Sequence, residues 1–160
     1  MMGSEVVTTL DDPPSHIFLQ AGVGGLAAAM TGYFRKCWGD RPTIIVVEPD
    51  AAPALLESIR AERPVRVTGP TSSMGRLDCK EPSLLALGEL ARGADFFVTV
   101  SDAQSEATVK LLQEHGINTT PSGAAGVSAL HHAGSYRNEL LLSEQSRVLA
   151  FITEGSEHTA

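Results

Sequence analysis

Residues 16–30 read HIFLQAGVGGLAAAM, and this stretch decides the fold class. Its first five residues are mostly apolar, with β-branched and aromatic members that favour a strand. Gly22, Gly24 and Gly25 interrupt the apolar run, and a helix-forming segment follows at once from Leu26 to Trp38. A strand that enters a helix through a tight glycine turn is typical of α/β proteins.

The remaining chain alternates in the same way between apolar runs and segments with helical spacing. Strands are expected at 43–50, 94–100 and 146–153, and helices at 53–62, 84–92, 103–115, 121–133 and 137–144. The run TIIVVEPD shows no polar alternation, as expected of a strand buried on both faces of a parallel sheet. Ser83 and Ser101 are predicted N-caps, and Gly116 is a predicted helix end. We therefore predict an α/β fold, with a mostly parallel sheet and helices on both faces.

Length and composition restrict the class of protein. The 160 residues suffice for one domain with a core, and 42% hydrophobic and 19% charged residues are ordinary for a soluble protein. The formal net charge of −7, without any basic run, argues against binding to nucleic-acid phosphates. No apolar stretch approaches the roughly 20 residues that span a bilayer, and the first residues do not form a secretory signal. We expect a cytoplasmic protein with no nucleic-acid or membrane partner.

The cysteines and histidines do not form a ligand pattern. Cys37 and Cys79 lie far apart without a C-x-x-C partner, which favours free thiols in a reducing compartment. The five histidines show no ligand spacing such as H-x-x-x-H. The sequence therefore predicts no metal site.

The stretch from 63 to 82 has no sustained period and mixes turn-forming with polar residues. A connection of this length in a compact domain is usually functional or mobile. It has few apolar residues beyond Met74 and Leu77, so we expect the loop 68–83 to be poorly ordered.

The glycine turn, residues 22–26, allows three interpretations. Main-chain N–H groups beside the positive end of a helix suit a phosphate. The turn lacks the Lys-Ser/Thr pair of a P-loop, which argues against nucleoside triphosphate hydrolysis. A dinucleotide site would use Gly22, Gly24 and Ala27, with Glu48 as the acid about 20 residues further on. In the third interpretation the glycines only let helix and strand pack closely.

Five sequence blocks occur in the same order as in one enzyme family: LQAGVGGLA, IIVVEPD, GRLDCKEPS, PSGAAG and FITEG. They resemble the C-terminal part of the diaminopropionate ammonia-lyases, which belong to the tryptophan-synthase-β-like (fold type II) pyridoxal-phosphate enzymes. The resemblance implies the large domain of that fold, with pyridoxal 5'-phosphate as the cofactor. It also implies that the glycine turn holds the cofactor phosphate through the main-chain N–H groups of Gly22, Val23, Gly24, Gly25 and Leu26.

Enzymes of this group place a hydroxyl near the pyridine nitrogen of the cofactor, which leaves that nitrogen largely unprotonated. By resemblance, two residues compete for this role. Ser122 lies in PSGAAG, where a helix N-cap is the alternative interpretation. Thr153 lies in ITEG, where a strand-end hydroxyl bonded to backbone is the alternative. Both are expected as cofactor-binding residues.

In the family, the chemistry begins with a lysine that forms a Schiff base with the cofactor. This chain has three lysines, Lys36, Lys80 and Lys110, and none lies in a segment that resembles a Schiff-base motif. The resemblance therefore implies a C-terminal fragment of an enzyme that converts 2,3-diaminopropionate to pyruvate and ammonia. This fragment has no catalytic residue of its own and is expected to be inactive alone. A non-catalytic module that binds a phosphate ligand, or one half of a split enzyme, is the alternative.

The expected organisation is a lead-in at 1–15, followed by a partial pyridoxal-phosphate-binding α/β domain at 16–160. The full enzyme would act on a small amino-acid substrate. A partial domain exposes apolar surface that the missing part would cover, so we expect a homo-oligomer.

Overall fold

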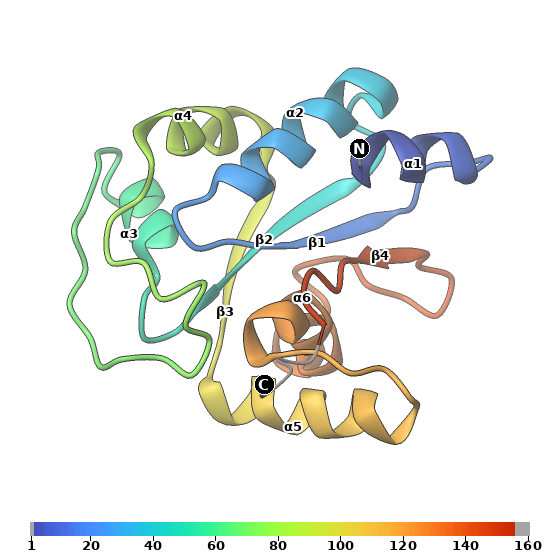
Figure 1. The fold of residues 1–160 in the computed structure, drawn as a ribbon. Helices are drawn as coiled ribbons and strands as arrows, with labels where there is room; N and C mark the ends of the chain where they lie inside the picture. The colour runs from blue at the N-terminus through green and yellow to red at the C-terminus, as the bar shows by residue number, and fades with distance from the viewer. Residues whose placement is uncertain (1, 156–160) are drawn as a thin grey trace.

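Figure 1 shows a computed structural model of the protein, which describes residues 2–155 as an α/β fold around one parallel sheet. Within these residues, the strands are β1 (His16–Gln20), β2 (Thr43–Pro49), β3 (Phe96–Val100) and β4 (Val148–Ala150). Their order in the sheet is β3-β2-β1-β4, and each neighbouring pair runs parallel. The predicted fold class is confirmed.

The two central strands, β1 and β2, are buried on both faces, as the unbroken apolar run of β2 predicted. β1 pairs with β2 from His16 opposite Thr43 to Gln20 opposite Val47. Successive side chains of a strand point to opposite faces, so each strand contributes to two hydrophobic cores. One core contains Ile17, Leu19, Ile44 and Val46, and the other contains Phe18, Ile45 and Val47.

The first face of the sheet is covered by the first four helices along the chain (Figure 1). α2 (Gly25–Trp38) packs on β1 and against α4 (Leu84–Gly93). α1 (Met2–Thr9) lies beside α2, and α3 (Ala54–Arg60) lies beside α4. The buried face of α2 is apolar, and its Phe34 stacks on Trp38 with ring centroids 4.9 Å apart.

The other face is covered by α6 (Pro121–His131), and α5 (Asp102–Glu114) packs on the outside of α6. Small residues dominate α6, which lets it approach the sheet closely. Among residues 2–155, no helix combines the length and the apolar character needed to cross a membrane.

Helix boundaries follow local capping chemistry. The Ser83 hydroxyl accepts a hydrogen bond from the Ala86 N–H at the start of α4. Ser101 and Gln104 form a capping box at the start of α5, and Gly116, with a φ of 77°, follows the C-cap residue His115 at its end. These three predicted boundaries are confirmed, because a cap depends on residues that are close in the sequence.

Two predictions near the C-terminus are wrong. The helix predicted at 137–144 is a series of turns, because Leu141 takes a positive φ of 57°, which interrupts helical geometry. The strand predicted at 146–153 is reduced to the three residues of β4, which pair with β1 alone at the edge of the sheet. Residues 151–155 are irregular and lie where β1 ends.

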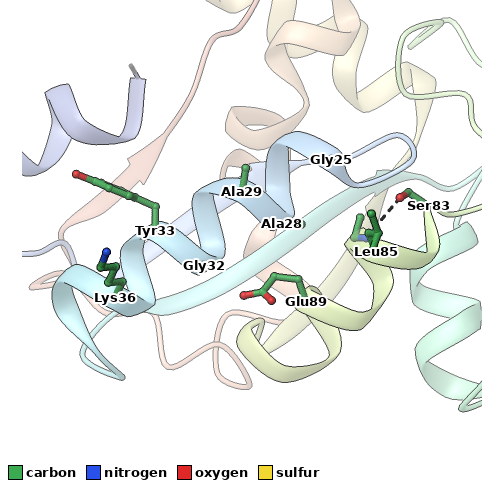
Figure 2. Close-up of a pocket in the computed structure, with 10 residues that line it drawn as sticks. Gly25, Ala28, Ala29, Gly32, Tyr33, Lys36, Ser83, Leu85 and Glu89 are labelled. Carbon is green, nitrogen blue, oxygen red and sulfur yellow. Dashed lines mark hydrogen bonds between the residues drawn. The ribbon is translucent and has the colours of Figure 1, made fainter.

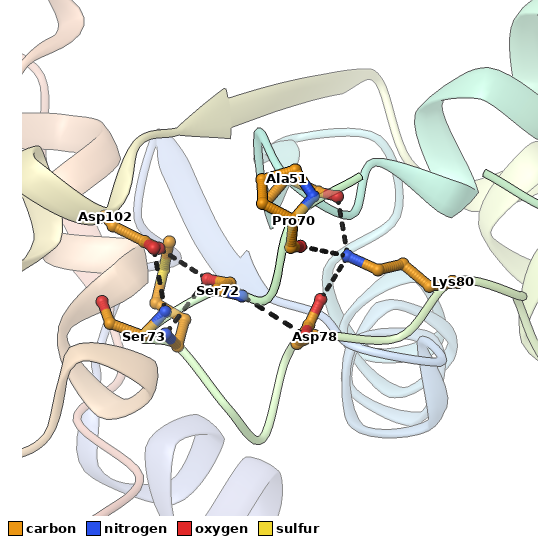
Figure 3. Close-up of polar contacts among 8 residues, drawn as sticks. Ala51, Pro70, Ser72, Ser73, Asp78, Lys80 and Asp102 are labelled. Carbon is orange, nitrogen blue, oxygen red and sulfur yellow. Dashed lines mark hydrogen bonds and ion pairs between the residues drawn. The ribbon is translucent and has the colours of Figure 1, made fainter. Parts of the chain in front are cut away.

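The long loop 63–82 is held in place by a lysine (Figure 3). The Lys80 ammonium donates to the carbonyl oxygens of Ala51 and Pro70 at 2.9 and 2.8 Å, and to the Asp78 carboxylate at 2.6 Å. These contacts tie two separate stretches of the loop to the segment that follows β2. We call this arrangement the lysine clip.

A second set of contacts ties the loop to α5 (Figure 3). The Asp102 carboxylate accepts hydrogen bonds from the Ser72 hydroxyl at 2.5 Å and from the Ser73 N–H at 2.9 Å. Met74 is fully buried and Leu77 nearly so, both in the core below α6. The prediction of a poorly ordered loop is wrong, because two apolar anchors and two polar clusters from distant segments fix it.

Candidate functional site

The glycine turn lies at the carboxyl end of β1 and at the start of α2. Gly24 is the N-cap residue of α2. It has a φ of 96°, and its carbonyl oxygen accepts a hydrogen bond from the Ala28 N–H at 2.8 Å. Within residues 2–155, none of the five N–H groups from Gly22 to Leu26 donates a hydrogen bond to another residue. Five free donors beside the positive end of a 14-residue helix are a favourable environment for an anion.

The glycine turn borders a cavity of about 360 Å³, which we call the ligand cavity. Its other walls come from the end of β1, from loop 63–82 and from the segment after β4, and they are Gln20, Ala21, Arg76, Leu77, Cys79, Thr153 and Glu154. A Cβ on Gly22 would lie 2.9 Å from the Arg76 carbonyl oxygen, whereas a Cβ on Gly25 would meet no atom within 4 Å. Gly22 therefore lets the loop approach the turn, and Gly25 faces open space.

The two predicted hydroxyls lie in different places. Thr153 lines the ligand cavity, and its Oγ1 accepts from the Gln20 Nε2 at 3.1 Å. Ser122 is buried, accepts from the Arg76 N–H at 3.2 Å and lines a neighbouring hollow of about 470 Å³. The N-cap interpretation of Ser122 is wrong, since Thr120 caps α6. The structure thus brings Thr153, and not Ser122, to the cavity that the glycine turn borders.

An ion pair separates the ligand cavity from the neighbouring hollow. The Arg76 Nε lies 2.9 Å from Glu154 Oε1, and the Thr120 hydroxyl donates to Glu154 Oε2. Both Arg76 and Glu154 line both spaces, so the pair forms their shared wall.

Sequence reasoning missed several residues of the cavity wall, namely Gln20, Arg76, Cys79 and Glu154. One signal was available for Gln20, which is a polar residue at the end of an otherwise buried strand and directly before the glycine turn. Arg76 and Cys79 offered no such signal, because only the folded loop brings them to the turn.

No lysine of the described residues lines the ligand cavity. Lys36 lies on α2, at the edge of an apolar hollow of about 630 Å³ between α2 and α4 (Figure 2). The Lys80 ammonium is held in the lysine clip, and Lys110 is exposed on α5. The cavity can thus hold an anion and a hydrogen-bond acceptor, but it offers no amine for covalent attachment.

Glu48 takes a different role from the one that a dinucleotide site requires. It is fully buried, and its two carboxylate oxygens accept from the Leu55 and Leu56 N–H groups at 2.7 and 2.8 Å. The carboxylate therefore binds the N-terminal end of α3 and is not available to a ribose. The dinucleotide interpretation is wrong in this respect. Burial raises the pKa of the Glu48 carboxyl to about 7, although the two N–H donors act in the opposite direction.

This pKa predicts a pH dependence of stability. The folded protein binds the Glu48 proton more tightly than the unfolded chain does. This proton therefore contributes its full stabilisation of the fold below the ordinary pKa of 4.5, and the contribution is lost as the pH rises through about 7. The free energy of unfolding should fall by about 3 kcal/mol over this range on account of Glu48. Urea unfolding of wild type and Glu48→Gln across this range measures the effect. In Glu48→Gln the free energy of unfolding should no longer fall with pH over this range. Glu106→Gln, at an exposed site on α5, is the control and should show the same fall as wild type.

Comparison with known proteins identifies relatives. The model of the family described as "Pyridoxal-phosphate dependent enzyme" matches residues 1–154. A diaminopropionate ammonia-lyase of Salmonella typhimurium is 33% identical, over 89% of this chain and 39% of that protein. The chain therefore spans about two-fifths of the length of this curated relative.

Solved structures of ammonia-lyases are also similar to this chain. The diaminopropionate ammonia-lyase of Escherichia coli in complex with D-serine matches with a TM-score of 0.82 and 28% identity, over 95% of this chain and 41% of that one. A fungal L-serine ammonia-lyase from Rhizomucor miehei matches with a TM-score of 0.86 and 25% identity, over 97% and 50%. Both the family model and these relatives cover nearly all of the chain. The chain belongs to the family of pyridoxal-phosphate dependent enzymes.

Proposed function

We propose that this chain is the C-terminal, cofactor-binding part of an ammonia-lyase that converts 2,3-diaminopropionate to pyruvate and ammonia. The observation that carries the proposal is the glycine turn, whose five unpaired N–H groups border the same cavity as Thr153. The 33% identity to a diaminopropionate ammonia-lyase supports the substrate.

The residues of the ligand cavity fit pyridoxal phosphate at two points. The five N–H groups of the glycine turn would hold the phosphate, with Gly25 leaving it room. The Thr153 hydroxyl would face the ring nitrogen. When bound, the cofactor supplies an electron sink for carbanion chemistry beside an amino group. This chain would bind and orient it, but would not attach it or catalyse alone, because no described lysine lines the cavity.

A second candidate reaction is the elimination of ammonia from a hydroxy amino acid. The similarity to an L-serine ammonia-lyase, at 25% identity, favours it as the runner-up. Product analysis on a full-length enzyme that contains this sequence separates the two reactions. Diaminopropionate releases two ammonia molecules per pyruvate, whereas serine releases one.

Cofactor binding by the chain itself tests the proposal. Pyridoxal phosphate should bind reversibly, inorganic phosphate should compete, and borohydride reduction should not fix the cofactor at one lysine. Thr153→Val should weaken pyridoxal phosphate about tenfold and leave inorganic phosphate unchanged, because it removes one hydrogen bond at the ring. Ser122→Ala is the matched variant and should change the affinity less than about twofold.

Calorimetric titration of the three proteins gives these affinities. A wild-type chain that binds neither pyridoxal phosphate nor phosphate would overturn the proposed function. A larger loss in Ser122→Ala than in Thr153→Val would assign the ring contact to Ser122 instead.

A further inference from the structure

Gln20 places a primary amide in a buried position at the end of β1. It ends β1 directly before the glycine turn, it is 3% exposed, and it lines the ligand cavity. The other members of the strand after His16 are apolar. Burying an amide costs free energy unless its donors and acceptors find partners. The contacts of Gln20 therefore indicate what the amide does.

The Gln20 amide group acts as a donor to the segment that follows β4. Its Nε2 lies 3.0 Å from the Phe151 carbonyl oxygen, 3.1 Å from Thr153 Oγ1 and 3.5 Å from the Gly123 carbonyl oxygen. Two of these partners are carbonyl oxygens, which can only accept. Turning the amide over would place Oε1 against Phe151 O, so the contacts fix Nε2 as the atom that faces Thr153.

This orientation sets the direction of the Thr153 hydroxyl. A hydroxyl has one proton to donate and two lone pairs that accept. One lone pair of the Thr153 hydroxyl accepts from Gln20, and within residues 2–155 its proton is donated to no acceptor. The proton is therefore free to be donated into the ligand cavity.

The oxygen of the Gln20 amide lies in an unfavourable environment. Gln20 Oε1 is buried and has no hydrogen-bond partner among the described residues. A Cβ on Gly126 would lie 3.0 Å from this oxygen, so glycine at that position of α6 provides the space. A buried acceptor without a partner costs about 1–3 kcal/mol. An apolar side chain of similar length would avoid that cost, and so the amide is explained better by its contact with Thr153.

We propose that Gln20 is a positioning residue that makes the Thr153 hydroxyl a hydrogen-bond donor, so that the ring nitrogen of a bound pyridoxal phosphate is held unprotonated. The inference rests on the proposed function and adds the device that sets the protonation state of the ring. Gln20 does not act on the ligand itself; it acts through Thr153.

The test follows the ring nitrogen of a probe that cannot react with lysine, 4'-deoxypyridoxine 5'-phosphate labelled with ¹⁵N. Its ¹⁵N chemical shift reports protonation of the nitrogen across a pH titration. Bound to the wild-type chain, the nitrogen should stay unprotonated over the range in which the free probe titrates. In Gln20→Glu the Thr153 proton is drawn to the new carboxylate, so the apparent pKa of the nitrogen should rise by about one unit, a tenfold change. Gln20→Met should weaken probe binding about tenfold, because Thr153 loses its fixed direction.

The Thr153→Val background separates positioning from general support of the fold. If Gln20 acts through Thr153, Gln20→Glu should cause no further change in the nitrogen shift when Thr153 is valine. Thermal unfolding of each variant is measured in parallel. If the buried carboxylate of Gln20→Glu prevents folding, Gln20→Met, which carries no charge, still tests the inference. A nitrogen that titrates alike in wild type and the Gln20 variants would overturn the inference alone. A wild-type chain that does not bind the probe would overturn the proposed function and the inference together.

Discussion

Replacing Gly24 with valine is expected to abolish phosphate binding by the glycine turn and to lower the free energy of unfolding by about 2–4 kcal/mol. Two separate effects contribute. Gly24 has a φ of 96°, which L side chains rarely adopt. A Cβ there would also lie 3.0 Å from the Ala86 Cβ and 3.1 Å from Leu55 Cδ1, so α2, α3 and α4 would have to move apart. The N–H groups would then no longer point at one site.

Gly116→Ala is the matched control for Gly24. Gly116 also has a positive φ, of 77°, but a Cβ there meets no atom within 4 Å and the residue does not line the ligand cavity. It should cost about 1–2 kcal/mol and leave phosphate binding intact. Urea unfolding and phosphate titration are compared for both variants. A folded Gly24→Val protein with wild-type affinity for phosphate would show that the glycine turn does not bind the ligand.

Replacing Lys80 with methionine should free the loop and weaken phosphate-ligand binding about tenfold. The variant loses all three hydrogen bonds of the lysine clip and leaves the Asp78 carboxylate without its cation. The hydrogen bond from Lys80 is the main reason that the pKa of Asp78 is lowered, so that pKa should rise in the variant. Arg76, Leu77 and Cys79 are the part of the loop that lines the ligand cavity, so loosening the clip disturbs that wall.

Hydrogen exchange measures this effect directly. Amide exchange should accelerate in residues 70–80 of Lys80→Met and remain unchanged in β1 and β2. Lys110→Met, at an exposed site on α5, serves as the control and should leave exchange in the loop unaltered. Equal protection of the loop in Lys80→Met and wild type would mean that Met74, Leu77 and Asp102 hold it without the clip.

The features predicted correctly from the sequence depend on neighbouring residues. The unbroken apolar run of β2 indicated burial on both faces, and the caps at Ser83 and Ser101 indicated where helices start. The glycine turn likewise combines a strand end, a left-handed residue and a helix start within a few positions. Local chemistry decides each of these, so one sequence suffices to find them.

The features that were missed depend on residues far apart in the chain. Gln20 and Thr153 form a hydrogen bond although they are 133 residues apart in the sequence. Lys80 donates to the Ala51 carbonyl oxygen, 29 residues before it. No local pattern encodes such contacts. The helix predicted at 137–144 failed for a related reason. Leu140 is buried in the second core while Leu141 is exposed with a positive φ, so packing overrode the intrinsic preference of the segment for a helix.

The pairing of β4 with β1 has a consequence for the order in which the molecule is assembled. Gln20 of β1 leaves the ribosome well before its partner Thr153, which is synthesised 133 residues later. Parallel pairing over so long a separation carries a high loop-closure entropy and is slow. β1 and β2 are close in the sequence and can pair before β4 is in place. At that stage the ligand cavity lacks the wall formed by the segment after β4. A nascent chain that ends before β4 lacks Thr153 and Glu154, so the wall that these residues give the ligand cavity is added only after β4 has been synthesised.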